Sequence, residues 1–309
     1  MVENFLSVLE QVVILFVLIG LGLVLGKTKL LADAGAKGVA NLVMYMVTPC
    51  TIIMSFQRKF DVQMLANLGI ALLASFLSIV LLIVISHLLY ARYGDESKKR
   101  ILRFATVFSN CGYMCLPLQG ALLGDDGLFY GAAYVAMFNL LVWSYGLVSM
   151  SGDRKEISGK KMLFNPGILG LVIGVALFLT SVKLPTVIAT PVQHLANLNT
   201  PLPMILVGYY LSQDNLLDAI RNKSNYGAVL LRLIVYPVLA IGGMYLCGLR
   251  GTMLVALAIA SSAPVAAITT IFAAKYNGDV KASVQLVSLS TLLSSVTMPT
   301  LVALTQWIA

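Results

Sequence analysis

Residues 109–117 read Ser-Asn-Cys-Gly-Tyr-Met-Cys-Leu-Pro and stand in the middle of a charge-free run, 104–124. A second run, 251–274, carries Ser-Ser-Ala-Pro at 261–264 and Thr269-Thr270 soon after. Proline removes a backbone donor and clashes with the carbonyl four residues back, and glycine permits non-helical backbone. Such backbone survives at membrane depth only where protein or a water-filled cavity satisfies its polar groups. The two breaks therefore predict a polar site inside a membrane protein.

The composition agrees with a lipid environment. The chain is 59% hydrophobic and 11% charged, whereas soluble chains are about 45–50% apolar and about 25% charged. The net charge of +8 lies in short basic clusters between apolar runs, so we expect the lipid bilayer as a partner and no nucleic acid. The four cysteines show neither disulfide nor zinc spacing, so we expect no metal.

The charge-free runs predict an all-α membrane protein with ten transmembrane helices. Glu3 and Glu10 stand where a signal peptide would carry lysine, so we expect the first run to remain as a helix. We extend it over 5–10, and we start the eighth near Tyr226 with Arg232 near its end. The runs are 11–26, 38–57, 62–91, 104–124, 127–152, 162–182, 184–213, 233–250 (less its terminal arginine), 251–274 and 282–309.

Basic residues predict the orientation. Of the 21 lysines and arginines, 17 fall in loops after odd-numbered spans, Arg232 counted among them. The opposite side holds Arg58, Lys59, Lys183 and Arg250. Because basic loops stay in the cytoplasm, we expect a multi-pass protein of the plasma (inner) membrane with both termini on the non-cytoplasmic side.

The two halves look like repeats. A shift of 152 residues places Thr48-Pro49 on Thr200-Pro201 and Ser109 on Ser261. A repeat of five spans must be inverted in the membrane, so we expect repeats at 1–152 and 162–309, with broken crossover helices in spans four and nine. Matched broken helices indicate a secondary transporter whose half-helix N-termini attract an anion. A proline kink without a site is the alternative, and it is our preferred interpretation at Thr48-Pro49 and Thr200-Pro201.

Several motifs resemble the auxin efflux carrier family, which includes plant auxin exporters and bacterial malate and malonate carriers. The best-matched pieces are Ser109-Asn110 followed by Pro117, and Ala263-Pro264 followed by Ala-Lys-Tyr-Asn at 274–277. Weaker matches are Asn165-Pro166, Trp143 and Pro49. The resemblance implies the crossed-helix fold of bile acid/sodium symporters and sodium/proton antiporters. Spans 1, 2, 6 and 7 would form a scaffold, and spans 3–5 and 8–10 a transport domain that moves like an elevator.

The resemblance also implies a site for a small organic carboxylate, either an auxin-like indole acid or a malate/malonate-type dicarboxylate. Its carboxylate-binding asparagine matches Asn110, and the neighbouring positions match Asn139, Thr48 and Asn165. The polar residues at the two breaks add hydroxyl donors, and glycine and proline hold the backbone open. These additional residues are Ser109, Ser261 and Ser262 as donors, and Gly112, Pro117 and Pro264 in the backbone.

Several alternatives remain open at this stage. We place no lysine or arginine near either break, which favours a monoanionic, partly apolar substrate or a co-transported cation, proton or sodium. His194 is either a proton-linked group or a packing residue. A cation-coupled exchanger or a channel is the second functional class. We expect neither an enzyme nor a cofactor, because no Ser/His/Asp or zinc-ligand set falls within the spans. A homodimer is open, since the glycines are equally explained by packing within the chain.

Overall fold

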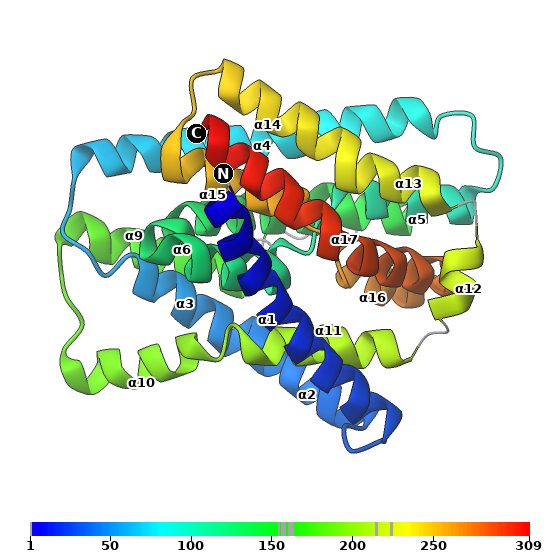
Figure 1. Ribbon diagram of the computed structural model, residues 1–309, viewed down its shortest axis with the longest axis horizontal. Helices are drawn as coiled ribbons and strands as arrows, with labels where there is room; N and C mark the ends of the chain where they lie inside the picture. The colour runs from blue at the N-terminus through cyan, green and yellow to red at the C-terminus, as the bar shows by residue number, and fades with distance from the viewer. Residues whose placement is uncertain (1, 154, 156–158, 160–163, 214–215, 223–224) are drawn as a thin grey trace.

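The computed structural model describes residues 2–153, 155, 159, 164–213, 216–222 and 225–309, and its regular elements in these ranges are helices (Figure 1). The helices are α1 (Val2–Lys27), α2 (Asp33–Leu42), α3 (Thr48–Ser55), α4 (Val62–Leu89), α5 (Glu96–Val107), α6 (Leu116–Leu141), α7 (Leu147–Ser151), α9 (Pro166–Thr180), α10 (Thr186–Asn197), α11 (Pro201–Ser212), α12 (Leu216–Arg221), α13 (Tyr226–Leu230), α14 (Tyr236–Leu246), α15 (Gly251–Ser262), α16 (Ile268–Lys275) and α17 (Val280–Ile308).

Within the described residues, six helical stretches are long and apolar enough to cross a membrane. One of them, Cys111–Ser151, has 41 residues and holds the end of the predicted fourth span together with the fifth. Gly124 divides it, because its φ of 61° and ψ of −149° lie outside the helical region. Two shorter apolar helices are Pro166–Thr180 and Gly251–Ser262. The all-helical, multi-pass membrane class is thus confirmed, whereas ten spans in inverted repeats stay a prediction.

In the part of the chain that the structure describes, four π-helical turns, each wider than an α-helical turn, interrupt the helices. They are Val43–Val47, Cys111–Cys115, Val142–Gly146 and Leu231–Val235. Three of the four end two residues before a proline, namely Pro49, Pro117 and Pro237. Because proline lacks an N–H and its ring pushes away the carbonyl four residues back, a wider turn relieves the clash without ending the helix. At Thr48-Pro49 the structure therefore has a continuous helix with a π-turn.

Spans four and nine are interrupted as predicted. α5 ends at Val107, and helix resumes at the π-turn Cys111–Cys115. α15 ends at Ser262, and α16 begins at Ile268. Between them, Ser109 and Val265 form an antiparallel β-bridge. We call the two non-helical segments, 108–110 and 263–267, the crossover.

Helices α1 and α11 pack in direct backbone contact, because two glycines lie between them. A Cβ atom at Gly208 would lie 1.9 Å from the carbonyl oxygen of Ile19, and one at Gly22 would lie 2.1 Å from that of Ile205. Small residues let membrane helices approach this closely. Figure 1 shows the two helices crossing at the lower centre, and α2 contacts α11 there.

The helices fall into two sets. The first set consists of the helices other than α1, α2, α3, α9, α10 and α11, and its members contact mainly one another. α6 contacts α4 and α15, and α15 also contacts α14 and α17, as Figure 1 shows for α14 and α15 at the top of the molecule. A second set consists of α1, α2, α3, α9, α10 and α11, in which α2 lies against α11, and α3 lies against α9 and α10. The sets meet where α6 contacts α3 and α9 and where α1 contacts α17. The crossover lies within the first set, and α3 approaches it from the second.

Candidate functional site

The crossover is held together by backbone hydrogen bonds between its two segments. The Asn110 N–H donates to the carbonyl of Pro264 at 2.8 Å, and the Ala266 N–H donates to the carbonyl of Phe108 at 3.0 Å. In a membrane interior, water cannot satisfy these groups, so each broken segment supplies the partners that the other needs. Pro264 has no backbone N–H that would need a partner, and its carbonyl oxygen accepts the hydrogen bond from the Asn110 N–H.

One more crossover donor is satisfied by a side chain. The Val265 N–H donates to Ser290 Oγ of α17 at 3.1 Å, and both residues are buried. The hydroxyl of Ser290 in turn donates to the carbonyl of Val287 at 3.1 Å. The last helix of the chain therefore holds the second crossover segment in place.

A buried arginine lies against the crossover, which corrects the prediction that no basic residue lies near the breaks. Arg232 is fully buried, and its guanidinium donates to four backbone carbonyls. Nε reaches Ala263 at 2.9 Å, Nη2 reaches Ser261 at 2.8 Å, and Nη1 reaches Thr106 and Val107 at 3.5 and 3.4 Å.

The sequence contained a signal for this arginine. Arg232 is a lone charge within the apolar stretch Tyr226–Leu246, and an ionisable residue inside a span faces the protein interior by default. The position of Arg232 near the boundary of the predicted eighth span makes it look like a loop residue in the sequence. In the structure, Arg232 lies in the π-turn Leu231–Val235, and its side chain is buried inside the protein.

A pocket of about 130 Å³ lies at the crossover and gathers five of the seven predicted binding residues. These are Thr48, Ser109, Asn110, Asn139 and Asn165. They come from α3, the crossover, α6 and the residue that precedes α9. The pocket is completed by Met44, Gly112, Tyr113, Val135, Phe138, Gly167, Tyr210, Ala266, Ala267, Ile268 and Ile271, of which sequence reasoning named only Gly112.

Asn139 and Asn165, which line the pocket outside the crossover, differ in which side-chain groups lack a hydrogen-bond partner. Asn165 Oδ1 accepts from the Gly167 N–H at 2.9 Å and so caps α9, which leaves its amide N–H groups for the pocket. Asn139 Nδ2 donates to the carbonyl of Val135 at 2.9 Å, which leaves its oxygen and one N–H. Glycine at 167 permits this arrangement, because a Cβ atom there would lie 2.8 Å from Asn139 Nδ2.

The residues nearest the crossover are donors without partners. Ser109 Oγ is buried and makes no hydrogen bond to nitrogen or oxygen within the described part of the chain; its neighbour is the thiol of Cys111, which is only a weak partner. The side-chain amide of Asn110 and the hydroxyl of Thr48 likewise have no hydrogen-bond partner among the described residues, although both residues are buried. A buried polar group without a partner is costly, so these three groups are suited to a polar ligand.

Two helix N-termini also meet at the pocket. One is the π-turn at Cys111–Cys115 that leads into α6, and the other is α16. Gly112 and Tyr113 from the first, and Ala267 and Ile268 at the second, line the cavity. The first N–H groups of a helix lack partners inside it, and the aligned peptides give this end a partial positive charge. The pocket is therefore suited to an anion.

Other predicted residues lie elsewhere. Ser261 Oγ donates to the carbonyl of Leu257 at 2.6 Å, and Ser262 Oγ is buried without a partner among the described residues; neither lines the pocket. Pro117 lines a different cavity, described below. His194 is exposed on α10 and belongs to neither cavity.

The second cavity, of about 350 Å³, lies between α3, α6 and α10. It starts about one helical turn from the pocket, since Thr48 lines the pocket and Thr51 lines this cavity. Its walls are mostly polar, and Asn199 Oδ1 is buried there without a partner among the described residues. The polar lining residues include Thr51, Ser55, Asp125, Gln193, Asn197, Asn199 and Thr200.

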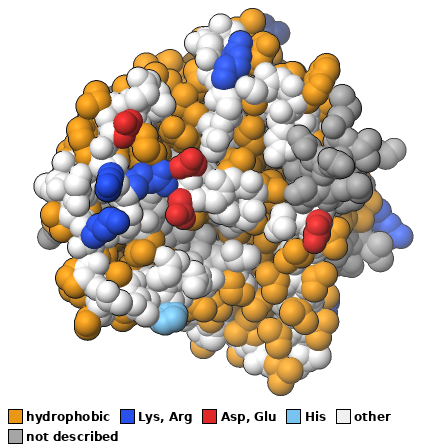
Figure 2. Space-filling view, turned by 60° about the vertical axis from the view of Figure 1, so that its left-hand side comes forward, with side chains coloured by type: hydrophobic (Ala, Val, Ile, Leu, Met, Phe, Trp, Pro, Cys, Tyr) orange, Lys and Arg blue, Asp and Glu red, His pale blue; other side chains and the backbone are white. Residues whose placement is uncertain are grey.

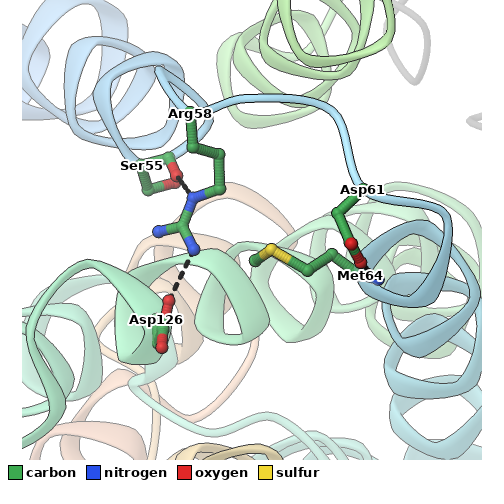
Figure 3. Close-up of polar contacts among 5 residues, drawn as sticks. All are labelled: Ser55, Arg58, Asp61, Met64 and Asp126. Carbon is green, nitrogen blue, oxygen red and sulfur yellow. Dashed lines mark hydrogen bonds and ion pairs between the residues drawn. The ribbon is translucent and has the colours of Figure 1, made fainter.

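An ion pair connects the two helix sets near this cavity (Figure 3). Arg58, after α3, donates to Asp126 of α6 at 2.5 Å and to the carbonyl of Ser55 at 2.9 Å. Its guanidinium also lies 5.0 Å from the centre of the Phe129 ring. Figure 2 shows basic and acidic side chains close together on the face at this end of the molecule.

Comparisons with known proteins cover nearly the whole length of the chain. The family model described as membrane transport protein matches residues 7–159 and 154–302. An uncharacterized transporter of Methanothermobacter thermautotrophicus is 27% identical over 299 residues, which are 96% of this chain and 97% of the relative. An uncharacterized transporter of Methanocaldococcus jannaschii is 23% identical over 313 residues, 97% and 98% of the two chains. The chain therefore belongs to the membrane transport protein family, and its resemblance to the auxin efflux carriers is confirmed.

Proposed function

We propose that this chain is a secondary carrier of a small organic carboxylate and that the pocket at the crossover binds it. One observation carries the proposal: unpaired N–H and O–H donors from Thr48, Ser109, Asn110 and Asn165 share one cavity with two helix N-termini. A carboxylate accepts hydrogen bonds only, and charge-assisted bonds of this kind are about twice as strong as neutral ones. The donors would fix the orientation of the carboxylate, and the helix ends would stabilise its charge.

The size of the pocket favours a short acid. An apolar cavity of about 150 Å³ holds benzene, and the pocket measures about 130 Å³. A three- or four-carbon dicarboxylate such as malonate or malate suits this volume, whereas an indole acid would extend beyond it. Arg232 also removes the earlier reason for preferring a monoanion, because a permanent positive charge lies against the crossover.

We further propose an elevator mechanism with ten spans in two inverted five-span repeats, 1–152 and 162–309. The scaffold would be the set α1, α2, α3, α9, α10 and α11, and the other helices would form the transport domain. Support comes from the packing, since each set contacts mainly its own members. Further support comes from the cavities at Thr48 and Thr51, one turn apart on α3, where the two sets meet.

The first test is thermal stabilisation of the purified protein by malate, malonate, indole-3-acetate and further carboxylates. We expect one class of acid to raise the unfolding temperature, and we expect Asn110→Ala to abolish this shift. Asn67→Ala is the matched control, because Asn67 lies half-buried on α4, outside both cavities, and accepts from Gln63 at 3.1 Å. Equal, small shifts for every acid in all three proteins would refute carboxylate binding at this pocket.

Uptake into proteoliposomes separates a carrier from the alternative class. A carrier of the stabilising acid saturates with concentration and exchanges labelled for unlabelled substrate. A channel would give flux that rises in proportion to concentration and shows no exchange, and a cation exchanger would move its ion in the absence of any acid. Either of the last two results would contradict the proposed function.

A further inference from the structure

Arg232 occupies an unusual position for a charged side chain. It lies in the π-turn Leu231–Val235, five residues before Pro237, and it is fully buried. Its guanidinium also lies 4.9 Å from the centre of the Tyr236 ring. Its partners among the described residues are backbone carbonyls and the Tyr236 ring, so within that part of the chain Arg232 has no carboxylate partner. A buried charge without an ion-pair partner needs another source of compensation.

That compensation comes from the ends of two half-helices. Thr106 and Val107 are the last two residues of α5. Ser261 lies in the last turn of α15, and Ala263 is the C-cap of that helix. The carbonyls of all four accept from the guanidinium. Each helix C-terminus carries a partial charge of about −0.5, so two ends carry about −1, which one guanidinium balances.

The arrangement divides the crossover by charge. The C-terminal ends of α5 and α15 face Arg232, while the N-terminal ends of the π-turn Cys111–Cys115 and of α16 line the pocket. Without a cation at the position of Arg232, the negative ends would oppose the positive ends, and an anion in the pocket would be held less tightly. Four converging carbonyl oxygens are also the kind of ligand set that binds an alkali cation.

We propose that Arg232 is a built-in cation that determines anion specificity: it neutralises the two helix C-termini at the crossover, so that carboxylate binding needs no bound sodium ion. This inference rests on the proposed function, because it concerns the charge balance of the same pocket. Arg232 acts through the crossover backbone and is a positioning residue, since it does not line the pocket.

The first test uses the unaltered protein. The dissociation constants of malate, malonate and indole-3-acetate are measured by calorimetry in sodium chloride and in choline chloride at equal ionic strength. We expect the acid that binds to do so equally in the two salts, within about twofold. Binding that appears only with sodium would overturn the role of Arg232 and leave the carboxylate site standing. A protein that binds none of the acids in either salt would overturn both proposals.

The second test changes the charge. Arg232→Lys keeps it, whereas Arg232→Gln keeps donors and removes it, and Arg232→Ala leaves space for an added cation. We expect Arg232→Lys to bind nearly as the wild type does, and Arg232→Gln to raise the dissociation constant at least about tenfold, equivalent to about 1.4 kcal/mol. For Arg232→Ala, we expect sodium or guanidinium chloride at a non-denaturing concentration to restore much of the affinity.

Arg250→Gln is the matched control, because Arg250 stacks on Tyr245 at 3.6 Å and is exposed. It should bind as the wild type does. If Arg232→Gln also binds as the wild type does, or if added cations restore nothing to a folded Arg232→Ala, the role of Arg232 is refuted. Size-exclusion elution and the unfolding temperature without ligand report whether each variant folds, and if the Gln and Ala variants do not, the comparison of salts on the wild type decides.

Discussion

Alanine at Gly208 should separate the two helices that pack most closely. The added Cβ would lie 1.9 Å from the carbonyl oxygen of Ile19 and 2.7 Å from the backbone nitrogen of Leu23. Ordinary van der Waals contact begins near 3.4 Å, so α1 and α11 must move apart by about 1.5 Å. The atoms in the way are backbone atoms, which cannot rotate aside as the end of a side chain can.

The magnitude follows from two opposing effects. Overpacking costs about 1–3 kcal/mol, and replacing glycine by alanine in a helix returns about 0.5–1 kcal/mol. The net loss for Gly208→Ala is about 1–2 kcal/mol. For chains of about 150–250 residues, 1 kcal/mol shifts the unfolding temperature by about 2–4 °C, so we expect a decrease of about 2–8 °C here.

Differential scanning fluorimetry of the detergent-purified protein measures this shift. Gly20→Ala is the control on the same helix pair, because a Cβ atom at Gly20 meets nothing within 4 Å. It should leave the unfolding temperature unchanged or slightly raised. Gly22→Ala should resemble Gly208→Ala, and the double variant should lose less than the sum, since one separation relieves both clashes. A Gly208→Ala protein as stable as Gly20→Ala would refute the close packing of α1 on α11.

Three further outcomes test the site and its supports. Gly167→Ala should weaken carboxylate binding with little change in unfolding temperature, because its Cβ would lie 2.8 Å from Asn139 Nδ2 and displace that amide. Calorimetry measures the affinity, and an unchanged affinity would exclude the Asn139 amide from binding. Ser290→Ala should cost about 1–3 kcal/mol, because the buried Val265 N–H loses its acceptor; an unaltered unfolding temperature would show that this bond is dispensable. Asp126→Asn should lower the unfolding temperature by no more than about 4 °C, because the Asp126 side chain is 58% exposed and such pairs contribute about 0.2–1 kcal/mol; a larger loss would show a stronger connection between the helix sets.

The breaks in the predicted spans four and nine were indicated by the sequence, because Ser109-Asn110 and Ser261-Ser262-Ala263-Pro264 place small polar residues inside long apolar runs. Pro264 also removes a backbone donor wherever the rest of the chain lies. Proline alone did not decide the outcome, because at Pro49 and at Pro117 the helix widens into a π-turn and continues, and the first break lies at 108–110. Whether a proline ends a helix depends on what satisfies the freed carbonyls, which is a property of the neighbouring helices.

The candidate site was predicted in part. Asn110, Asn139, Thr48 and Asn165 were named from a resemblance, and the structure brings them into one pocket with Ser109. The sequence also predicts that the hydroxyls of Ser261 and Ser262 line the same site, because these serines stand at the second break. They lie outside the pocket because they belong to the end of α15, whereas it is the start of α16 that lines the cavity.

By itself, the amino-acid sequence determined that the chain is helical, crosses a membrane several times and breaks two of its spans. These properties depend on hydropathy, charge and proline, which act over a few neighbouring residues. Only the tertiary structure decided that Arg232 meets the ends of α5 and α15, more than 100 and about 30 residues away along the chain. Such a contact depends on how whole helices pack, and the packing of helices in lipid depends on small shape differences that no local pattern records.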